Sequence, residues 1–436
     1  MSSLPLAPHV TVIGAGPVGC VSALQFAQRG ASVLLLEAGG SKGDRLAGEW
    51  LHPPGLKILE DLGVPWRQLA GDYEQGKGFV VFPEDKTDPI HLSYPSGVYG
   101  LSCCHTALLK LLRETAANHL NILYLSEARV TRIESQTLQI SHKKLETIEV
   151  FSEQIIGADG RGAISRKAVG DRSQAELLSY MAGMILHDVQ LPFEGYGHVL
   201  PGGPGPVLAY RIGPNAIRMM VDVPVSTFQG ARDRQQALWE DYSAVMPSSL
   251  LPAFKQAITH QKIVWCANRT RPRVRYGRPG LALIGDAAGH CHPITATGMT
   301  LGFQDAATLA NSQTFKQYER TRLFNTYVPE LLSKALYRAF TEQDETAIAL
   351  RQAIYKMWRQ ASAERMRTIR LLAVMETRFT SFCRPFLKGL GIAIGALVVR
   401  KLTLGQWKSL FKTVSSLSDW LKLVVETRRI GIGSQQ

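Results

Sequence analysis

The opening segment of the chain, VTVIGAGPVGCVSALQFAQRGASVLLLEAG (residues 10–39), constrains the fold most strongly. A β-branched stretch, VTVI, predicts a strand, and a second apolar stretch, VLLL, predicts another. Between them the apolar residues recur at helical spacing. The segment is therefore predicted to be a βαβ unit.

Three glycines in this unit, Gly14, Gly16 and Gly19, have the spacing G-x-G-x-x-G. They permit a tight turn, the approach of a pyrophosphate to the N–H groups that begin a helix, and close helix–strand packing. Glu37 ends the second strand, where it can accept hydrogen bonds from a ribose 2′-OH. The pattern predicts a Rossmann-type dinucleotide site, with Ala38 beside Glu37 at the end of the second strand.

Two later segments point to a flavin. Asp159-Gly160 follows the apolar stretch QIIGA, and Gly285-Asp286 follows LALI. Asp286 can accept hydrogen bonds from ribityl hydroxyls, and the turn at Gly298-Met299 opens a helix whose N–H groups can face the flavin ring. Because a second G-x-G-x-x-G is absent, the pattern favours FAD as the resident cofactor.

The stretch LIGDAAGHCHPITATGMT (residues 283–300) has two other readings. Side chains of the consecutive residues His290, Cys291 and His292 diverge, and no further cluster completes a tetrahedral set, so no metal site is predicted. Cys291 has no recognisable triad, which favours a packed thiol over a nucleophile. His292-Pro293 is expected to shape the backbone, although His292 could also titrate near the ring.

These segments predict an α/β fold with three parts. Residues 8–170 and 271–325 form a discontinuous Rossmann-type FAD-binding domain, and the β-rich, Gly/Pro-punctuated residues 171–270 form an inserted substrate domain. Strands near 76–95 are expected to join the substrate sheet. Residues 326–436 have helical periodicity and form a C-terminal tail.

The charge of the chain is concentrated in its C-terminal quarter. Of the formal +13, residues 331–436 hold 18 Lys+Arg against 7 Asp+Glu. Basic and apolar stretches alternate there without a nucleic-acid motif, which indicates an anionic membrane surface or, equally, a solvated basic face on packed helices. The apolar run at 389–399 is shorter than the ~20 residues of a spanning helix, so in-plane attachment is expected.

The N-terminus predicts no signal peptide, and six cysteines without a C-x-x-C pair favour reduced thiols facing the cytosol.

Longer segments resemble squalene monooxygenase (squalene epoxidase), within the superfamily of single-component FAD-dependent monooxygenases and aromatic hydroxylases. The resemblance runs from Val10 to beyond Tyr355 and is carried by GDRLAGEWLHPPGLKILEDLGV, GPVLAYRIGPNAIRMMVDVP, HPITATGMTLGFQDA and ALYRAFTEQDETAIALRQAIY. It implies the family's membrane-seated helical tail. It also implies flavin contacts at Pro17, Val18, Glu37, Arg45, Asp286 and Met299, with Trp50 near the ring.

The chain departs from the family's pattern at four places. His52 stands where the family has a Gln, and Phe79 stands where it has the Tyr whose hydroxyl pairs with that Gln beside the flavin. The family's HPLTGGGM is HPITATGM, and His105 replaces an Arg used near the cofactor. We expect FAD binding to survive, with His52 and Phe79 as the substrate-facing pair on a more apolar wall.

The resemblance implies that NAD(P)H reduces FAD, that O₂ adds to the reduced flavin as a C4a-hydroperoxide, and that one oxygen is transferred to a carbon centre. The expected substrate is a lipophilic isoprenoid or prenylated molecule, a quinone or quinolone being favoured over squalene, and a separate reductase is possible. The expected location is the cytoplasmic face of a membrane. Two alternatives remain: a flavin-dependent reductase of isoprenoid double bonds, and a non-enzymatic lipid-binding module. The W-x-W-x-I-P run of flavin halogenases is absent.

Overall fold

The structure, a computed structural model, describes residues 7–39, 49–69, 73–143, 145–162, 164–230, 233–261, 263–403 and 420. Arg45 lies outside the described residues, so the expectation for its flavin contact has no structural counterpart here.

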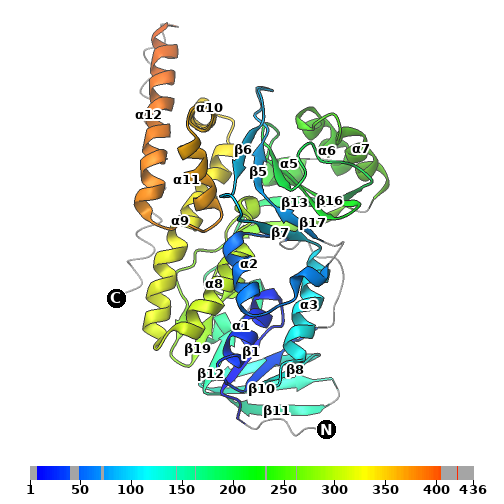
Figure 1. Cartoon of the computed structure of the whole chain (residues 1–436), viewed down its shortest axis with the longest axis vertical. Coiled ribbons are helices and arrows are strands. Elements are labelled where there is room, and N and C mark those ends of the chain that lie inside the picture. The colour runs from blue at the N-terminus through cyan, green and yellow to red at the C-terminus, as the bar shows by residue number, and fades with distance from the viewer. Residues whose placement is uncertain are drawn as a thin grey trace.

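A six-stranded sheet of order β18-β19-β12-β1-β2-β8 forms the lower half of the molecule (Figure 1). Its strands are β1 (Val10–Ile13), β2 (Val33–Leu36), β8 (Ile122–Leu125), β12 (Gln154–Gly157), β18 (Gly277–Arg278) and β19 (Leu281–Leu283). β1 pairs in parallel with β2 and β12, and β12 pairs in parallel with β19. Helix α1 (Pro17–Ala27) connects β1 to β2, which confirms the βαβ unit and the α/β fold. The glycine-rich turn, the Asp159 turn and the Asp286 turn therefore lie at one edge of the sheet, because each follows a parallel strand.

A seven-stranded sheet of order β17-β13-β16-β15-β14-β5-β6 forms the second layer. Five strands come from residues 176–270, namely β13 (Glu176–His187), β14 (Tyr196–Leu200), β15 (Val207–Gly213), β16 (Ala216–Pro224) and β17 (Val264–Thr270). β5 (Gly78–Val81) joins them by pairing in parallel with β14, and β6 (Ile90–Ser93) pairs with β5.

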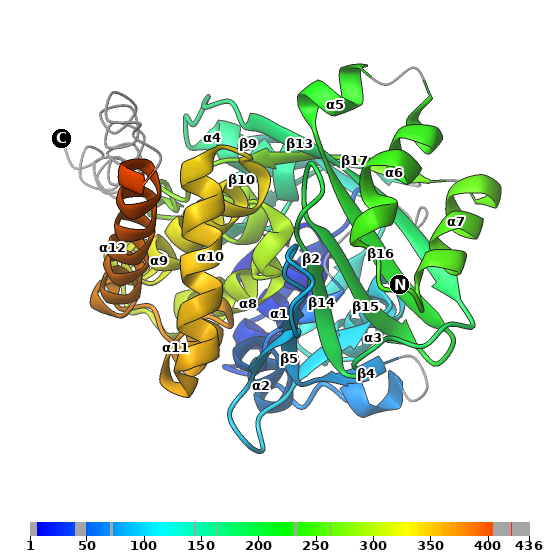
Figure 2. The ribbon, with the colours of Figure 1, turned by 90° about the horizontal axis from the view of Figure 1, so that it is seen from above.

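The segment expected to be β-rich also contains three helices, α5 (Val225–Gly230), α6 (Arg234–Tyr242) and α7 (Leu251–His260). Asp233 caps α6 by accepting hydrogen bonds from the backbone of Gln235 and Gln236. Leu238 and Phe254 are buried in the apolar cluster of the β13–β16 sheet. The helices form because their apolar faces pack on one side of this sheet (Figure 2).

Two smaller sheets and four helices complete the sheet-bearing part. The sheets are β9 (Ala128–Glu134), β10 (Thr137–His142) and β11 (Leu145–Phe151), and β3 (Trp50–Leu51), β7 (Gly100–Cys103) and β4 (Tyr73–Gly76). The helices are α2 (Pro53–Asp61), α3 (His105–Ala117), α4 (Ile164–Ala168) and α8 (Gly298–Asn311).

Four C-terminal helices, α9 (Phe315–Thr341), α10 (Glu345–Gln360), α11 (Ser362–Leu372) and α12 (Phe379–Thr403), lie on the side opposite α5–α7 (Figures 1 and 2). The expected 11-residue apolar run is part of α12. Phe379–Arg400 has a mean hydropathy of 1.6 and is long and apolar enough, by length and composition, to cross a membrane. The helix is therefore longer than the 11-residue run from which in-plane attachment was predicted, and in-plane attachment remains a prediction.

Candidate active site

The glycine-rich turn is shaped by contacts that exclude side chains. Gly14 has φ of +102°, and a Cβ there would lie 2.6 Å from the carbonyl oxygen of Ala158. A Cβ on Gly19 would lie 1.8 Å from the carbonyl oxygen of Gly14. These two glycines therefore allow β1, α1 and the loop after β12 to approach one another closely.

Two helix N-termini fit an anionic or polar cofactor. α1 begins after Gly16 and α8 begins at Gly298, and none of the described side chains caps either helix by a hydrogen bond. A Cβ on either glycine would meet no described atom within 4 Å. The first N–H groups of α1 can thus approach a pyrophosphate, and those of α8 can approach a flavin ring. The glycine-rich turn and these two helix N-termini together form a cradle whose residues fit FAD.

Glu37 lies at the end of β2, facing the glycine-rich turn. One carboxylate oxygen accepts a hydrogen bond from the Ala15 N–H at 3.0 Å and lies 3.1 Å from Nη2 of Arg113. The Nε of Arg113 donates to the Ala15 carbonyl at 2.8 Å. Arg113, on α3, was not predicted; it holds both the turn and the carboxylate that is expected to accept the ribose. Ala38 follows Glu37 and is exposed.

The two later aspartates have different surroundings. Asp159 accepts hydrogen bonds from the backbone N–H of Ser165 at 3.1 Å and from its hydroxyl, so its carboxylate holds the local turn. Asp286 is half-exposed and lies 3.1 Å from Nε of Arg161. Its turn packs against Val18, because a Cβ on Gly285 would lie 3.2 Å from the Val18 side chain. Asp286 is the carboxylate of the pair that remains accessible to a ligand.

A buried ion triad beneath the Asp286 turn was also not predicted. Asp305 lies 2.7 Å from both Arg273 and Arg322, and all three side chains are almost completely buried. Asp305 also accepts from the Gly285 N–H at 2.8 Å, while Arg273 donates to the Gly285 carbonyl at 3.0 Å. The triad therefore fixes both peptide groups of Gly285 and, through them, the position of Asp286.

His52 belongs to a chain of buried hydrogen bonds. Its Nε2 lies 2.9 Å from the Thr295 carbonyl and its Nδ1 lies 2.7 Å from the Tyr94 hydroxyl. Since a carbonyl only accepts, Nε2 carries the proton and Nδ1 accepts from Tyr94. The Tyr94 oxygen in turn accepts from the Trp50 indole N–H at 3.1 Å. Burial lowers the pKa of His52 to about 4, so the ring is neutral at physiological pH.

An aromatic wall surrounds this chain. The Phe79 ring lies 5.0 Å from the Trp50 ring and 5.8 Å from the His52 ring, between centroids, and Tyr210 lies 6.0 Å from Trp50. The structure thus brings the predicted pair His52 and Phe79 together. It changes their expected chemistry: Tyr94, after β6, supplies the hydroxyl that Phe79 lacks, and neither nitrogen of His52 is left to serve a substrate.

The loop from His290 to Met299 connects both layers. His292 Nε2 donates to Asp222 on β16 at 3.0 Å, while its Nδ1 accepts from the Ile294 N–H at 3.2 Å. Pro293 begins the short 3₁₀ turn after His292. Ala296 has φ of +52°, a left-handed conformation. The motif HPLTGGGM, to which HPITATGM was compared above, has Gly at this position. The loop is therefore held in a shape that a glycine would adopt more easily.

The remaining predicted residues are placed as follows. Met299 packs on the α1–α8 apolar core, and His105 begins α3 and is buried. Burial raises the pKa of the Cys291 thiol, the opposite of what a nucleophilic thiolate requires. Within the described part of the chain, no group of three or more His, Cys, Asp or Glu side chains could hold a metal ion.

The chain is similar in sequence to squalene epoxidases. The squalene epoxidase family model matches residues 152–410, more than half of the chain. Squalene epoxidase erg1 of Aspergillus fumigatus is 29% identical over 80% of this chain and 78% of its own length. Squalene epoxidase ERG1 of Candida albicans is 26% identical over 80% of this chain and 83% of its own. Against squalene epoxidase 2 of Arabidopsis thaliana the identity is 28%, and the match spans 63% of that protein.

Solved structures show the same fold at low identity. The flavin-dependent brominase Bmp2 has a TM-score of 0.73 with 17% identity, over 88% of this chain and 98% of that one. PqsL from Pseudomonas aeruginosa, described as a probable FAD-dependent monooxygenase, has a TM-score of 0.60 with 17% identity, over 88% and 99%.

Proposed function

Because the chain belongs to the squalene epoxidase family and is an FAD-dependent monooxygenase that uses NAD(P)H and O₂, we propose that it oxygenates a lipophilic isoprenoid or prenylated molecule. FAD supplies the activation of O₂ when bound. The N–H groups of α1 and α8, with Glu37 and Asp286, are the groups that would hold it. The side chains of the aromatic wall would bind and orient the substrate and exclude water from it.

The aromatic wall carries the proposal for the substrate. Trp50, Phe79 and Tyr210 belong to one buried apolar cluster with Leu331 on α9 and Leu371 on α11. An aromatic head group can stack on the wall, each ring contact contributing about 0.5–1.5 kcal/mol, while a prenyl chain lies along the apolar cluster. We therefore favour a prenylated quinone or quinolone over squalene. This preference rests on the rings alone, since the hydrogen-bonding capacity of His52 is already used.

Membrane attachment through α12 is part of the proposal. Leu387, Ile394 and Val399 are exposed on this helix, at 53%, 36% and 64%. Exposed apolar side chains on a helix long enough to enter a bilayer favour attachment at a membrane, with the catalytic part on its cytoplasmic face.

The test uses detergent-solubilised, FAD-loaded protein. NAD(P)H oxidation and oxygenated product are measured with squalene and with a prenylated quinol or quinolone, each with and without an added reductase. Oxygenation of the prenylated aromatic at a higher kcat/KM supports the proposal. Efficient epoxidation of squalene with an inert prenylated aromatic would contradict the preference, and a product with a saturated double bond and no added oxygen would contradict monooxygenation.

A further inference from the structure

Ala296 combines backbone strain with a departure from the family's motif. Its φ of +52° and ψ of 25° lie in the left-handed region, which is unfavourable for any residue with a Cβ and favourable for Gly. Because HPLTGGGM has Gly at this position, the strain is a property of this chain. A strained residue persists only where the surrounding contacts hold it, and such residues cluster at functional sites.

The turn around Ala296 is held from two sides. On one side the Thr295 carbonyl accepts a hydrogen bond from Nε2 of His52 at 2.9 Å. On the other side Nε2 of His292 donates to Asp222 at 3.0 Å. Both anchors, His52 and Asp222, are completely buried. The turn cannot relax without breaking buried hydrogen bonds, so the direction of the Ala296 methyl group is fixed.

The methyl group of Ala296 lies where the aromatic wall meets the turn that begins α8. It packs on the apolar cluster that contains Trp50, Phe79 and Tyr210, and Ala296 is nevertheless only partly buried. Gly298, two residues later, is exposed and begins α8, whose N–H groups fit a flavin ring. A molecule that lies on the wall with its reacting carbon at the flavin therefore comes into contact with this methyl group.

We propose that Ala296 is a specificity-determining residue, whose methyl group limits the width of the substrate's reacting end. An end that carries two methyl branches is disfavoured against a flat ring or an end with a single branch. The inference rests on the proposed function, in which a lipophilic molecule lies on the aromatic wall. One methylene in an apolar site changes kcat/KM by about 10–200-fold, so one methyl group of the protein is large enough to decide between such substrates.

The experiment uses FAD-loaded Ala296→Gly and two probes that differ only in branching. One probe is squalene, which carries two methyl groups at each end, and the other is its analogue lacking one methyl group at each end. Binding is measured without NAD(P)H, from the change in the flavin absorbance spectrum, and kcat/KM is measured separately. We expect the parent to prefer the analogue, and Ala296→Gly to raise the affinity and kcat/KM for squalene at least about tenfold relative to the analogue.

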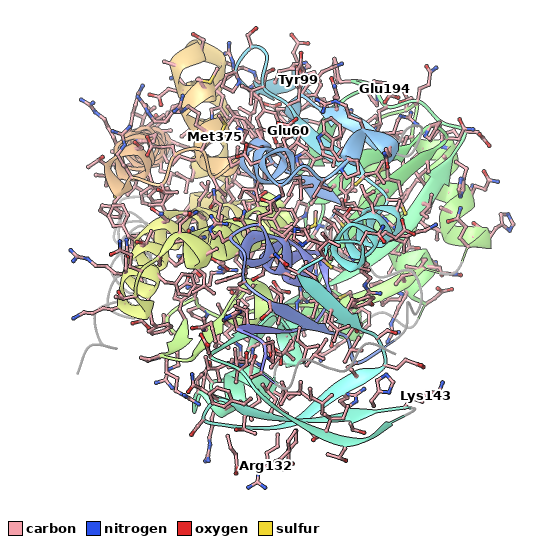
Figure 3. The ribbon with its side chains drawn as sticks, turned by 60° about the horizontal axis from the view of Figure 1, so that its bottom comes forward. Glu60, Tyr99, Arg132, Lys143, Glu194 and Met375 are labelled. Atoms are coloured by element: carbon pink, nitrogen blue, oxygen red, sulfur yellow. The ribbon has the colours of Figure 1, made fainter. Side chains whose placement is uncertain are left out.

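The matched control is Ser135→Gly, which removes another left-handed residue. Ser135 has φ of +52° and lies in the exposed turn between β9 and β10. This turn belongs to the sheet whose Arg132 points outward at the edge of the molecule (Figure 3). Both glycine variants should unfold at a higher temperature than the parent, since both relieve strain. Only Ala296→Gly should change the preference between the probes.

Other results overturn the assignment. An unchanged ratio between the probes in Ala296→Gly would do so, as would a parent that already prefers squalene. An equal gain for both probes would assign the effect to a looser turn instead of the methyl group. The same change of preference in Ser135→Gly would assign it to stability. A protein that binds both probes with the expected change of preference but oxygenates neither would contradict the proposed function and leave the assignment of Ala296 intact.

Discussion

The glycines of the cradle differ in whether the fold or only the cofactor requires them. Gly14 and Gly19 are needed for backbone packing, whereas a side chain at Gly16 would meet no described atom within 4 Å. Gly16 also has φ of −72° and ψ of 177°, an extended conformation that any residue adopts. A substitution at Gly16 therefore tests cofactor binding without disturbing the packing of the fold.

We expect Gly16→Val to fold with a stability within about 1 kcal/mol of the parent. Bound FAD should fall below roughly a tenth of the parent level, because the isopropyl group occupies the space that a pyrophosphate needs. Absorbance ratios after gel filtration and a thermal unfolding curve measure the two effects. Gly391→Val, at an equally open position on α12, is the control and should retain FAD. Normal FAD content in Gly16→Val would refute the cradle.

His52 provides a prediction for acid stability. Its pKa is lowered by burial to about 4 in the folded protein, below the ordinary value of 6.5. The folded state therefore favours the neutral ring, and its contribution to stability is fully present above pH 6.5 and is lost as the pH falls toward 4. Between pH 7 and pH 5 the loss amounts to about 2 kcal/mol.

His52→Gln should remove this part of the pH dependence. Urea unfolding at pH 7 and pH 5 gives the two free energies of unfolding, and their difference should shrink by about 2 kcal/mol in the variant. His198 and His290, whose pKa values are also lowered to about 4 by burial, remain in both proteins. His260→Gln, an exposed histidine on α7, is the control. An unchanged difference in His52→Gln would show that the ring is not buried as a neutral base.

At the scale of elements, the Arg273–Asp305–Arg322 triad connects α8 and α9 to the Asp286 turn. Asp305→Asn leaves two buried guanidinium groups without their carboxylate, which should destabilise the protein by about 3–5 kcal/mol. FAD should also dissociate more readily, because both peptide groups of Gly285 are held by this triad. Thermal unfolding and FAD titration measure the two effects.

Asp286→Asn is the matched control for this prediction. Its side chain is half-exposed, so the change should weaken FAD binding while leaving the free energy of unfolding nearly unchanged. If Asp305→Asn unfolds like the parent, the triad does not stabilise the turn.

The same elements show what the sequence could predict. The three turns that end β1, β12 and β19 were predictable, because each is a local pattern: an apolar strand is followed by a glycine-rich turn after β1, and by Gly and Asp after β12 and β19. The triad was not, because Arg273, Asp305 and Arg322 are far apart in sequence and no local period connects them. Tyr94 was missed for the same reason. Helices α6 and α7 were missed because Gly and Pro punctuation in their region favours turns and strands.

At the scale of the whole molecule, α12 has two different faces. Leu390, Ala393 and Leu397 are buried against Ala347 and Leu350 of α10. Leu387, Ile394 and Val399 are exposed on the same helix. Since one face stabilises the helical layer and the other faces outward, folding and membrane attachment can be changed separately.

We expect Leu387→Ser, Ile394→Ser and Val399→Ser, combined, to release the protein from vesicles while its thermal unfolding stays unchanged. Each serine removes about 1.5–3 kcal/mol of apolar burial in the lipid. Vesicle flotation measures the bound fraction, and high salt alone should release only part of the parent, because screening weakens the attraction of the basic residues but not apolar burial.

The control for this triple variant is Leu390→Ala, a residue of α12 that is buried against α10. It leaves a cavity against α10 and should lower the free energy of unfolding by about 2–5 kcal/mol, while the folded protein still floats with the vesicles. The two variants thus give opposite results in the two measurements, which a general loosening of the helix would not do. A triple serine variant that floats like the parent would place membrane attachment on another surface of the molecule.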